Sequence, residues 1–285
     1  SNVKEDLARM ITLEMGKPIV QAIAEVEKCI WLCEYYAANA VQMLKPEKLN
    51  IEGLDVQRRR DPLGPVFGIM PWNFPIWQAL RYAIPSLAIG NSVLLKPAPN
   101  VIGCSLILEG AIAKATNDSR LFRVLVIDTN LVKKVISSPE VRGVTFTGSD
   151  KAGGIVAGLA GKYRKPSVLE LGGSDPFIVL GDANVQAAGE AFVQSRMNNT
   201  GQTCIAAKRA IVDAEILDDF IDVVSKTTKD LVVGEPGDEA TDISCLARED
   251  IWENLVHQVT RSESAASRVV HGGIVSGTNY YHPEH

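Results

Sequence analysis

The chain has 285 residues, of which 46% are hydrophobic and 22% are charged, and its net charge is −5 at pH 7. This composition predicts a packed globular core, and it excludes the basic surface by which proteins bind nucleic acids or anionic membranes. Apolar runs stay well short of the roughly 20 residues that a membrane-spanning helix needs. The five cysteines are scattered and odd in number, which favours free thiols in a reducing compartment, the cytoplasm.

The first part of the chain predicts two helices, over residues 3–15 and 18–44. Gly16 suits the end of the first helix, and Pro18 suits the start of the second. Apolar residues recur at helical spacing through the second segment. Residues 54–69 then predict two strands around a turn rich in glycine and proline.

Strands and helices alternate from residue 67 onward. The predicted strands cover residues 67–72, 91–97, 121–127, 141–149 and 166–173, and the predicted helices cover 75–89, 100–115, 129–138 and 150–162. Nearly continuous apolar strands that alternate with helices indicate a parallel sheet with helices on both faces. A second α/β pattern follows, with strands at 175–180 and 208–213 and helices at 185–197 and 217–233. We therefore predict an α/β fold with two domains, residues 1–172 and residues 173–285.

Polar residues lie near or just beyond the carboxyl ends of three predicted strands of the first domain: Asn73, Lys96 and Glu170. Ligands of an open α/β sheet bind beyond the carboxyl ends of its strands, so these side chains are expected at one edge. The Asn73 amide is suited to donate a hydrogen bond to an oxyanion, or else it satisfies backbone groups of its loop. Glu170 is either a loop-fixing carboxylate or a general base whose pKa would be raised by partial burial. Lys96 adds a cation to this edge, unless it is simply solvated.

A glycine-rich strand-to-helix connection, FTGSDKAGG, spans residues 146–154. Backbone N–H groups and the helix dipole at such a helix start favour an anion, most naturally a phosphate. The stretch matches neither the G-x-G-x-x-G fingerprint nor a Walker sequence. The alternative is that the glycines only permit close packing, and the pattern alone leaves both interpretations open.

Cys204 lies in the polar, glycine-containing stretch NNTGQTCIAAKR, residues 198–209. A thiol in a polar turn is more exposed than one in an apolar helix, so Cys204 is a candidate nucleophile. No histidine lies nearby in the sequence, which favours Glu170 as the base and leaves pairing with one of the four distant histidines as the alternative. Cys29 and Cys33 stand on one face of a helix and are expected to be buried apolar thiols, with a metal-binding pair as the alternative.

Five stretches occur in order along the chain: MPWNFPIW, LLKPAP, VTFTGS, LELGGSDPFIV and NTGQTC. Together they resemble the aldehyde dehydrogenase superfamily over nearly the whole chain. The resemblance implies a Rossmann-like coenzyme domain for NAD or NADP over residues 1–172 and a catalytic domain over residues 173–285. It also implies that the Cys204 thiolate attacks an aldehyde, while Asn73 and the Cys204 backbone N–H bind the oxyanion. Glu170 would then activate the water that hydrolyses the thioester.

The same resemblance implies further contacts with the coenzyme. Lys96 is similar to the residue that holds the adenosine ribose, and Trp72 is similar to a residue that lines the same cleft. Three residues match the family's helix start at the coenzyme pyrophosphate: Gly148, Ser149 and Gly153. Pro99 stands where strongly NAD-preferring relatives carry a glutamate, so that either NAD or NADP is compatible with this position.

The resemblance also implies a small aldehyde substrate. Arg81 lies eight residues after Asn73 and is similar to the arginine that meets the substrate carboxylate in succinate-semialdehyde dehydrogenases. An arginine that some of these enzymes carry six residues before the cysteine is replaced by Asn198. Both positions are candidate substrate contacts, and the expected substrate is succinate semialdehyde.

The resemblance covers the middle of the family, so we expect the chain to be truncated at both ends. Residues 52–66 match the family's intersubunit hairpin, which implies a homo-oligomer. A second hypothesis is a catalytically inactive remnant that acts as a binding or assembly protein. A third is an enzyme that transfers the acyl group of the thioester, and Glu170 argues against it, because a base placed for hydrolysis works against transfer.

Overall fold

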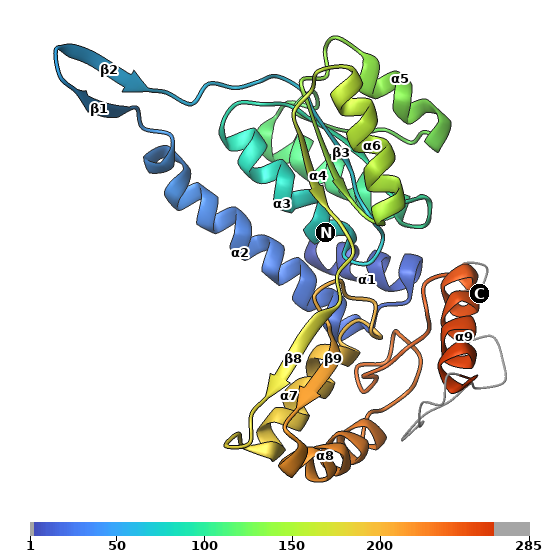
Figure 1. Cartoon of the computed structure of the whole chain (residues 1–285). Coiled ribbons are helices and arrows are strands. Elements are labelled where there is room, and N and C mark those ends of the chain that lie inside the picture. Colours follow the sequence, from blue (N-terminus) through green and yellow to red (C-terminus); the bar gives the residue numbers. More distant parts are fainter. Residues whose placement is uncertain (1–2, 265–285) are drawn as a thin grey trace. The chain divides into compact units, whose positions relative to one another are not determined.

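A computed structural model describes residues 3–264 of the chain (Figure 1). The chain divides into two compact units, of residues 1–10 with 23–172 and of residues 11–22 with 173–285. This division crosses the first two helices, α1 (Val3–Met15) and α2 (Ile19–Met43). Across residues 3–264 every helix is too short or too polar to span a bilayer.

The first unit is built around a sheet of five parallel strands, as the alternating pattern predicts. The strands are β3 (Val66–Ile69), β4 (Val93–Lys96), β5 (Phe122–Val124), β6 (Gly143–Thr147) and β7 (Ser167–Glu170). Their order is β5-β4-β3-β6-β7, so the chain leaves the central strand β3 toward one edge, returns beside β3 and continues to the other edge. This reversal makes a switch point beyond the carboxyl ends of β3 and β6, where open α/β sheets bind ligands.

Helices cover both faces of this sheet (Figure 1). They are α3 (Pro75–Ala88), α4 (Ile102–Thr116), α5 (Val132–Ser137) and α6 (Asp150–Lys162). Successive residues of a strand point to opposite faces. Phe67 of β3 packs in a buried apolar cluster with Ile136 of α5 and Val156 of α6. The next residue, Gly68, faces α3, and a Cβ atom there would lie 2.1 Å from Cζ of Tyr82, so only glycine permits this close approach.

The hairpin of the first unit differs from the prediction. Its strands are β1 (Glu47–Ile51) and β2 (Leu54–Arg58), which pair in antiparallel register. The hairpin expected at residues 52–66 therefore lies at residues 47–58, and β2 does not pair with β3. Gly53 supplies the left-handed φ of +76° at the turn. The segment after β2 contains two prolines, which lack the N–H groups that a strand ladder needs.

The second unit contains a pair of parallel strands, β8 (Asp175–Val179) and β9 (Ala207–Val212), with the helices α7 (Val185–Met197) and α8 (Leu217–Lys229). Three aromatic rings join these elements, because Phe192 lies 5.5 Å from Phe177 and 5.7 Å from Phe220 between ring centroids. α8 ends earlier than the predicted residue 233, and a further helix, α9 (Glu249–Ser264), lies beyond the elements that the sequence predicted.

Candidate functional site

The parallel sheet brings together the polar residues that were predicted to share its edge. In the strand register, Ile69 lies beside both Lys96 and Phe146, and Thr147 lies beside Glu170. Asn73 follows β3 in the loop that leads to α3. The carboxyl ends of β3, β4, β6 and β7 thus present an amide, an ammonium group, a hydroxyl and a carboxylate along the edge at which open α/β sheets generally bind ligands.

Glu170 and Arg81 face each other at this edge. Nη1 of Arg81 lies 3.9 Å from Oε2 of Glu170, and Nη2 of Arg81 donates a hydrogen bond to Oγ1 of Thr147 at 3.4 Å. The side chains of Arg81 and Glu170 are 37% and 56% exposed. Solvent therefore screens the pair, and it contributes about 1 kcal/mol or less to the stability of the fold. The sequence did not predict this pairing. Because both contacts are weak, Arg81 can exchange them for another anion at little cost.

The loop that carries Trp72 and Asn73 is anchored by a carboxylate from another helix. α3 begins at Pro75, and the preceding residue, Phe74, has no side chain that could cap the helix. Instead Glu25 of α2, which is only 4% exposed, accepts hydrogen bonds from the N–H groups of Ile76 and Trp77 at 2.9 and 3.0 Å. Glu25 thereby satisfies two of the orphan donors of α3 and complements its dipole. The missing cap at residue 74 was the signal in the sequence that such a partner was needed.

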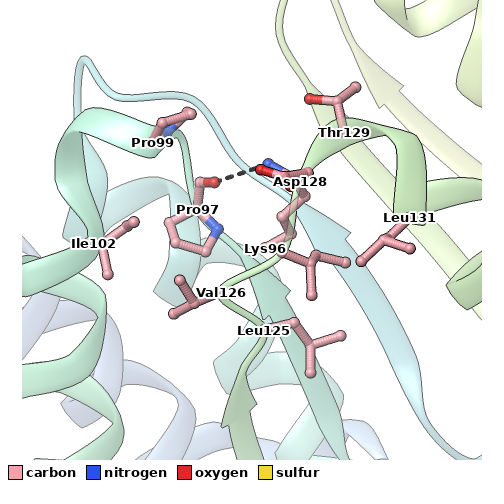
Figure 2. Close-up of a pocket in the computed structure, with 10 residues that line it drawn as sticks. Lys96, Pro97, Pro99, Ile102, Leu125, Val126, Asp128, Thr129 and Leu131 are labelled. Carbon is pink, nitrogen blue, oxygen red and sulfur yellow. Dashed lines mark hydrogen bonds between the residues drawn. The ribbon is translucent and has the colours of Figure 1, made fainter.

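Lys96 is not a solvated surface lysine. It is 6% exposed, and its Nζ donates a hydrogen bond to the carbonyl oxygen of Pro97 at 3.2 Å. It lines a pocket of about 260 Å³ between the ends of β4 and β5, together with Asp128 (Figure 2). Burial lowers the pKa of Lys96, and the negative charge of Asp128 opposes this shift. The pocket walls are mainly apolar: Pro97, Pro99, Ile102, Leu125, Val126, Ile127 and Leu131.

The start of α6 combines a cap with close packing. Ser149 caps the helix by accepting a hydrogen bond from the N–H of Ala152 at 3.3 Å. A Cβ atom at Gly148 would lie 2.6 Å from the ring of Phe146, and one at Gly153 would lie 2.3 Å from Cδ2 of Leu171. Close packing therefore accounts for both glycines, as the alternative interpretation of this stretch expected. The positive end of the helix dipole remains compatible with a phosphate, so the anion site stays a prediction.

Cys204 is the exposed cysteine among the five, all of which are free thiols. Cys29 and Cys104 are buried, and Cys33 and Cys245 are half-buried. Burial, and then the charge of a neighbouring carboxylate, raises the pKa of the Cys33 thiol. Burial raises the pKa of Cys245 to about 11. Since the nucleophile must be accessible and ionised, exposure favours Cys204 over the other four, and the raised pKa values disfavour Cys33 and Cys245.

The turn before Cys204 is held by partly buried hydrogen bonds. Asn199, which is fully buried, donates its backbone N–H to Oε1 of Gln21 at 2.7 Å and its side-chain amide to the carbonyl of Gln202 at 3.3 Å. Asn199 and Thr200 both adopt left-handed backbone, with φ of +57° and +54°. That conformation is unfavourable for a β-branched residue such as Thr200 and persists only where the surroundings impose it. The turn that precedes the thiol is therefore held by hydrogen bonds to Gln21 and Gln202.

Asn198 lies at the end of α7 and lines a second pocket, of about 540 Å³, with Gln21, Gln194 and other residues of the second unit. Cys204 is absent from the described residues that line this pocket, so a role for Asn198 in binding the substrate stays a prediction. Arg196, the nearest arginine, donates a hydrogen bond from Nη1 to the carbonyl oxygen of Gly201 at 3.2 Å. Its guanidinium thus supports the backbone of the turn that leads to Cys204.

Comparison with known proteins matches the family described as "Aldehyde dehydrogenase family" over residues 1–284. The chain is 42% identical over 281 residues to the succinate semialdehyde dehydrogenase [NAD(P)+] Sad of Escherichia coli K12, covering 98% of this chain and 61% of that relative. It is 41% identical over 283 residues to the succinate-semialdehyde dehydrogenase [NADP(+)] of Mycobacterium avium, covering 98% and 60%. The chain thus spans about 60% of the length of the curated relatives it matches.

Solved structures show the same likeness. The Gox0499 structure superposes with a TM-score of 0.95 at 33% identity, covering 97% of this chain and 60% of that one. The succinic semialdehyde dehydrogenase of Streptococcus pyogenes, solved in complex with NADP+, superposes with a TM-score of 0.94 at 29% identity, covering 97% and 61%. Both the sequence match over residues 1–284 and these superpositions lead to one conclusion: the chain belongs to the aldehyde dehydrogenase family.

Proposed function

We propose that this chain serves the NAD(P)-dependent oxidation of succinate semialdehyde to succinate through a thioester on Cys204. The observation that carries the proposal is that a member of the aldehyde dehydrogenase family exposes one of its five cysteines, next to a turn held by partly buried hydrogen bonds. The names of the relatives from E. coli and M. avium support the choice of substrate. The alternative of an acyl-transferring enzyme has no comparable support.

The proposed reaction has two halves. The Cys204 thiolate attacks the aldehyde carbon, and the carbonyl oxygen becomes an oxyanion that accepts hydrogen bonds from the Asn73 amide and the Cys204 backbone N–H. A nicotinamide coenzyme held in the first unit would supply the acceptor for the hydride that leaves this carbon. The carbon is now a thioester, and Glu170 removes a proton from a water molecule that attacks it. The carbon–sulfur bond breaks, the carboxylate leaves, and the thiol is regenerated.

Arg81 is proposed to bind the distal carboxylate of the substrate. A guanidinium presents several N–H donors in a planar fork that matches a carboxylate. Its present partners, Glu170 at 3.9 Å and Thr147 at 3.4 Å, are held weakly enough to be exchanged. An exchange would also free the Glu170 carboxylate from its cationic neighbour. We assign no comparable observation to Asn198, which remains a second proposed contact.

The residues of the first unit fit a nicotinamide coenzyme. The apolar pocket with the buried ammonium group of Lys96 suits a ribose and its neighbouring ring system. Ser149 and the N-terminus of α6 suit the pyrophosphate, with Gly148 and Gly153 keeping the helix close to the strand behind it. Trp72, half-buried in the loop after β3, is proposed to line the same cleft. Either NAD or NADP satisfies these contacts.

We further propose that the hairpin of β1 and β2 contacts a second copy of the chain. Its tip exposes two apolar side chains, Ile51 and Leu54, which keep 47% and 64% of their surface accessible. Exposed apolar residues on a projecting hairpin are suited to an interface. The same surface would serve the alternative function of a catalytically inactive assembly protein. Five free thiols are consistent with a cytoplasmic location, which is likewise a proposal.

Turnover by the purified 285-residue chain tests the proposal. Succinate semialdehyde is mixed with NAD+ or NADP+, and formation of the reduced coenzyme is followed by its absorbance. We expect Cys204→Ala to abolish the signal and Cys33→Ala, a matched change at a half-buried thiol, to preserve it. Equal activity of the chain and of Cys204→Ala would refute the role of this thiol. Absence of activity in the chain would favour the binding or assembly function.

A further inference from the structure

The pocket at Lys96 contains the carboxylate of Asp128, which does not cap the short helix that follows it. Asp128 precedes the short 3-10 helix η2 (Thr129–Leu131), in the capping position. An aspartate there usually accepts a hydrogen bond from the N–H groups of the helix, but the Asp128 side chain makes no capping bond. It lines the pocket instead, in the segment that follows β5, the strand beside β4, which ends at Lys96 (Figure 2). Asp128 is the only acidic residue among the described residues that line this pocket.

The two charges of the pocket oppose each other. Lys96 is 6% exposed, and its ammonium group alone would attract any anion that entered. Asp128 is close enough to influence the ionisation of Lys96, so its negative charge acts on the same volume. A phosphate monoester carries about −1.5 to −2 charges at pH 7 and is repelled by a carboxylate. A neutral hydroxyl instead donates a hydrogen bond to a carboxylate, which accepts at both oxygens.

We propose that Asp128 selects NAD over NADP by accepting a hydrogen bond from the 2′-hydroxyl of the adenosine ribose and repelling a 2′-phosphate. This inference rests on the proposed function, in which the Lys96 pocket holds that ribose. Pro99, which has no charge, lines the same pocket and leaves the discrimination to Asp128. The inference predicts a coenzyme preference that differs from that of the M. avium relative, which is named as an NADP(+) enzyme.

Calorimetric titration of the full chain with NAD+ and with NADP+ tests the inference, with the ratio of the two dissociation constants as the readout. We expect the wild-type chain to bind NAD+ more tightly. Asp128→Asn should shift the ratio about tenfold toward NADP+. The reason is that repulsion between one carboxylate near the surface and the 2′-phosphate changes the dissociation constant by about this factor. Asp128 is exposed, so the substitution should not prevent folding. Asp55→Asn, on the hairpin, changes the net charge equally and should leave the ratio unchanged.

Three results would overturn the inference in distinguishable ways. If Asp128→Asn leaves the ratio unchanged, or if Asp55→Asn shifts it equally, Asp128 does not select the coenzyme although the proposed site can stand. If both coenzymes bind but Lys96→Met weakens neither, the ribose lies elsewhere, and the proposed coenzyme site fails together with the inference. If the wild-type chain binds neither coenzyme, the proposed function of the chain fails as well.

Discussion

Removing the Glu25 carboxylate should loosen the segment that carries Trp72 and Asn73. This carboxylate is 4% exposed and accepts hydrogen bonds from the Ile76 and Trp77 N–H groups at 2.9 and 3.0 Å. In Glu25→Ala both donors lose a charged acceptor in a place that water reaches poorly. In Glu25→Gln one amide oxygen remains to accept them, without the negative charge that favours the helix N-terminus.

The two hydrogen bonds to Glu25 determine how much stability the substitutions should cost. A hydrogen bond to a charged group contributes about 1.5–3 kcal/mol, and an unsatisfied buried donor costs about 1–3 kcal/mol. We therefore expect Glu25→Ala to lower the free energy of unfolding by about 3 kcal/mol, near the middle of the range for a buried polar network. Glu25→Gln should cost about 1 kcal/mol, the difference between a charged and a neutral acceptor.

Urea unfolding and amide hydrogen exchange measure the effect together. Glu27 provides the matched control, because it lies on the same helix, is exposed and pairs with Lys4 at 2.6 Å. Such a surface pair contributes about 1 kcal/mol or less, so Glu27→Ala should change stability little. Hydrogen exchange at Ile76 and Trp77 should accelerate in Glu25→Ala and not in Glu27→Ala. Equal losses of stability in the two variants, with unchanged exchange at these amides, would refute the anchoring role of Glu25.

Three further predictions concern the same unit. Gly68→Ala should lower the free energy of unfolding by about 3 kcal/mol, because the new methyl group meets the ring of Tyr82. Gly110→Ala, which has open space around it, should instead stabilise α4 by about 0.5–1 kcal/mol. Gly153→Ala should destabilise the protein and Gly154→Ala should stabilise it, because only the first meets a neighbour within 4 Å; equal thermal shifts would contradict this. Arg81→Ala should raise KM for succinate semialdehyde about tenfold more than for an uncharged aldehyde of similar size, and equal changes would exclude carboxylate recognition.

The sequence predicted the strands of the first unit because local patterns determine them. The apolar runs that end at Lys96, Thr147 and Glu170 could be read directly, and the parallel arrangement follows from their alternation with helices. Once the sheet was parallel, the grouping of these residues at one edge followed as well. The burial of Lys96 did not follow, because it depends on a pocket wall formed by residues 125–131, in the loop and 3-10 helix that follow β5.

What the sequence could not predict depends on contacts between distant segments. Glu25 lies 51 residues from the N–H group of Ile76, and nothing in its own helix indicates that it faces another helix end. The pairing of Arg81 with Glu170 spans 89 positions (170 − 81) in the same way. The hairpin was misplaced because the prolines after β2 were taken as its turn, while Gly53 supplies the turn with its left-handed backbone. The partly buried hydrogen bond from Asn199 to Gln21 joins residues that are 178 positions apart.

Trapping the acyl group on Cys204 tests the central claim most directly. Glu170→Gln removes the proposed base for hydrolysis, so the thioester should accumulate when this variant is incubated with succinate semialdehyde and NAD+ or NADP+. Mass spectrometry of the peptide that contains Cys204 should then show a succinyl group. This group should be absent without coenzyme, and it should be absent from the corresponding peptide of the double variant that combines Glu170→Gln with Cys204→Ala. A modified Cys29, Cys33 or Cys245 with an unmodified Cys204, or no adduct in the presence of either coenzyme, would contradict the account.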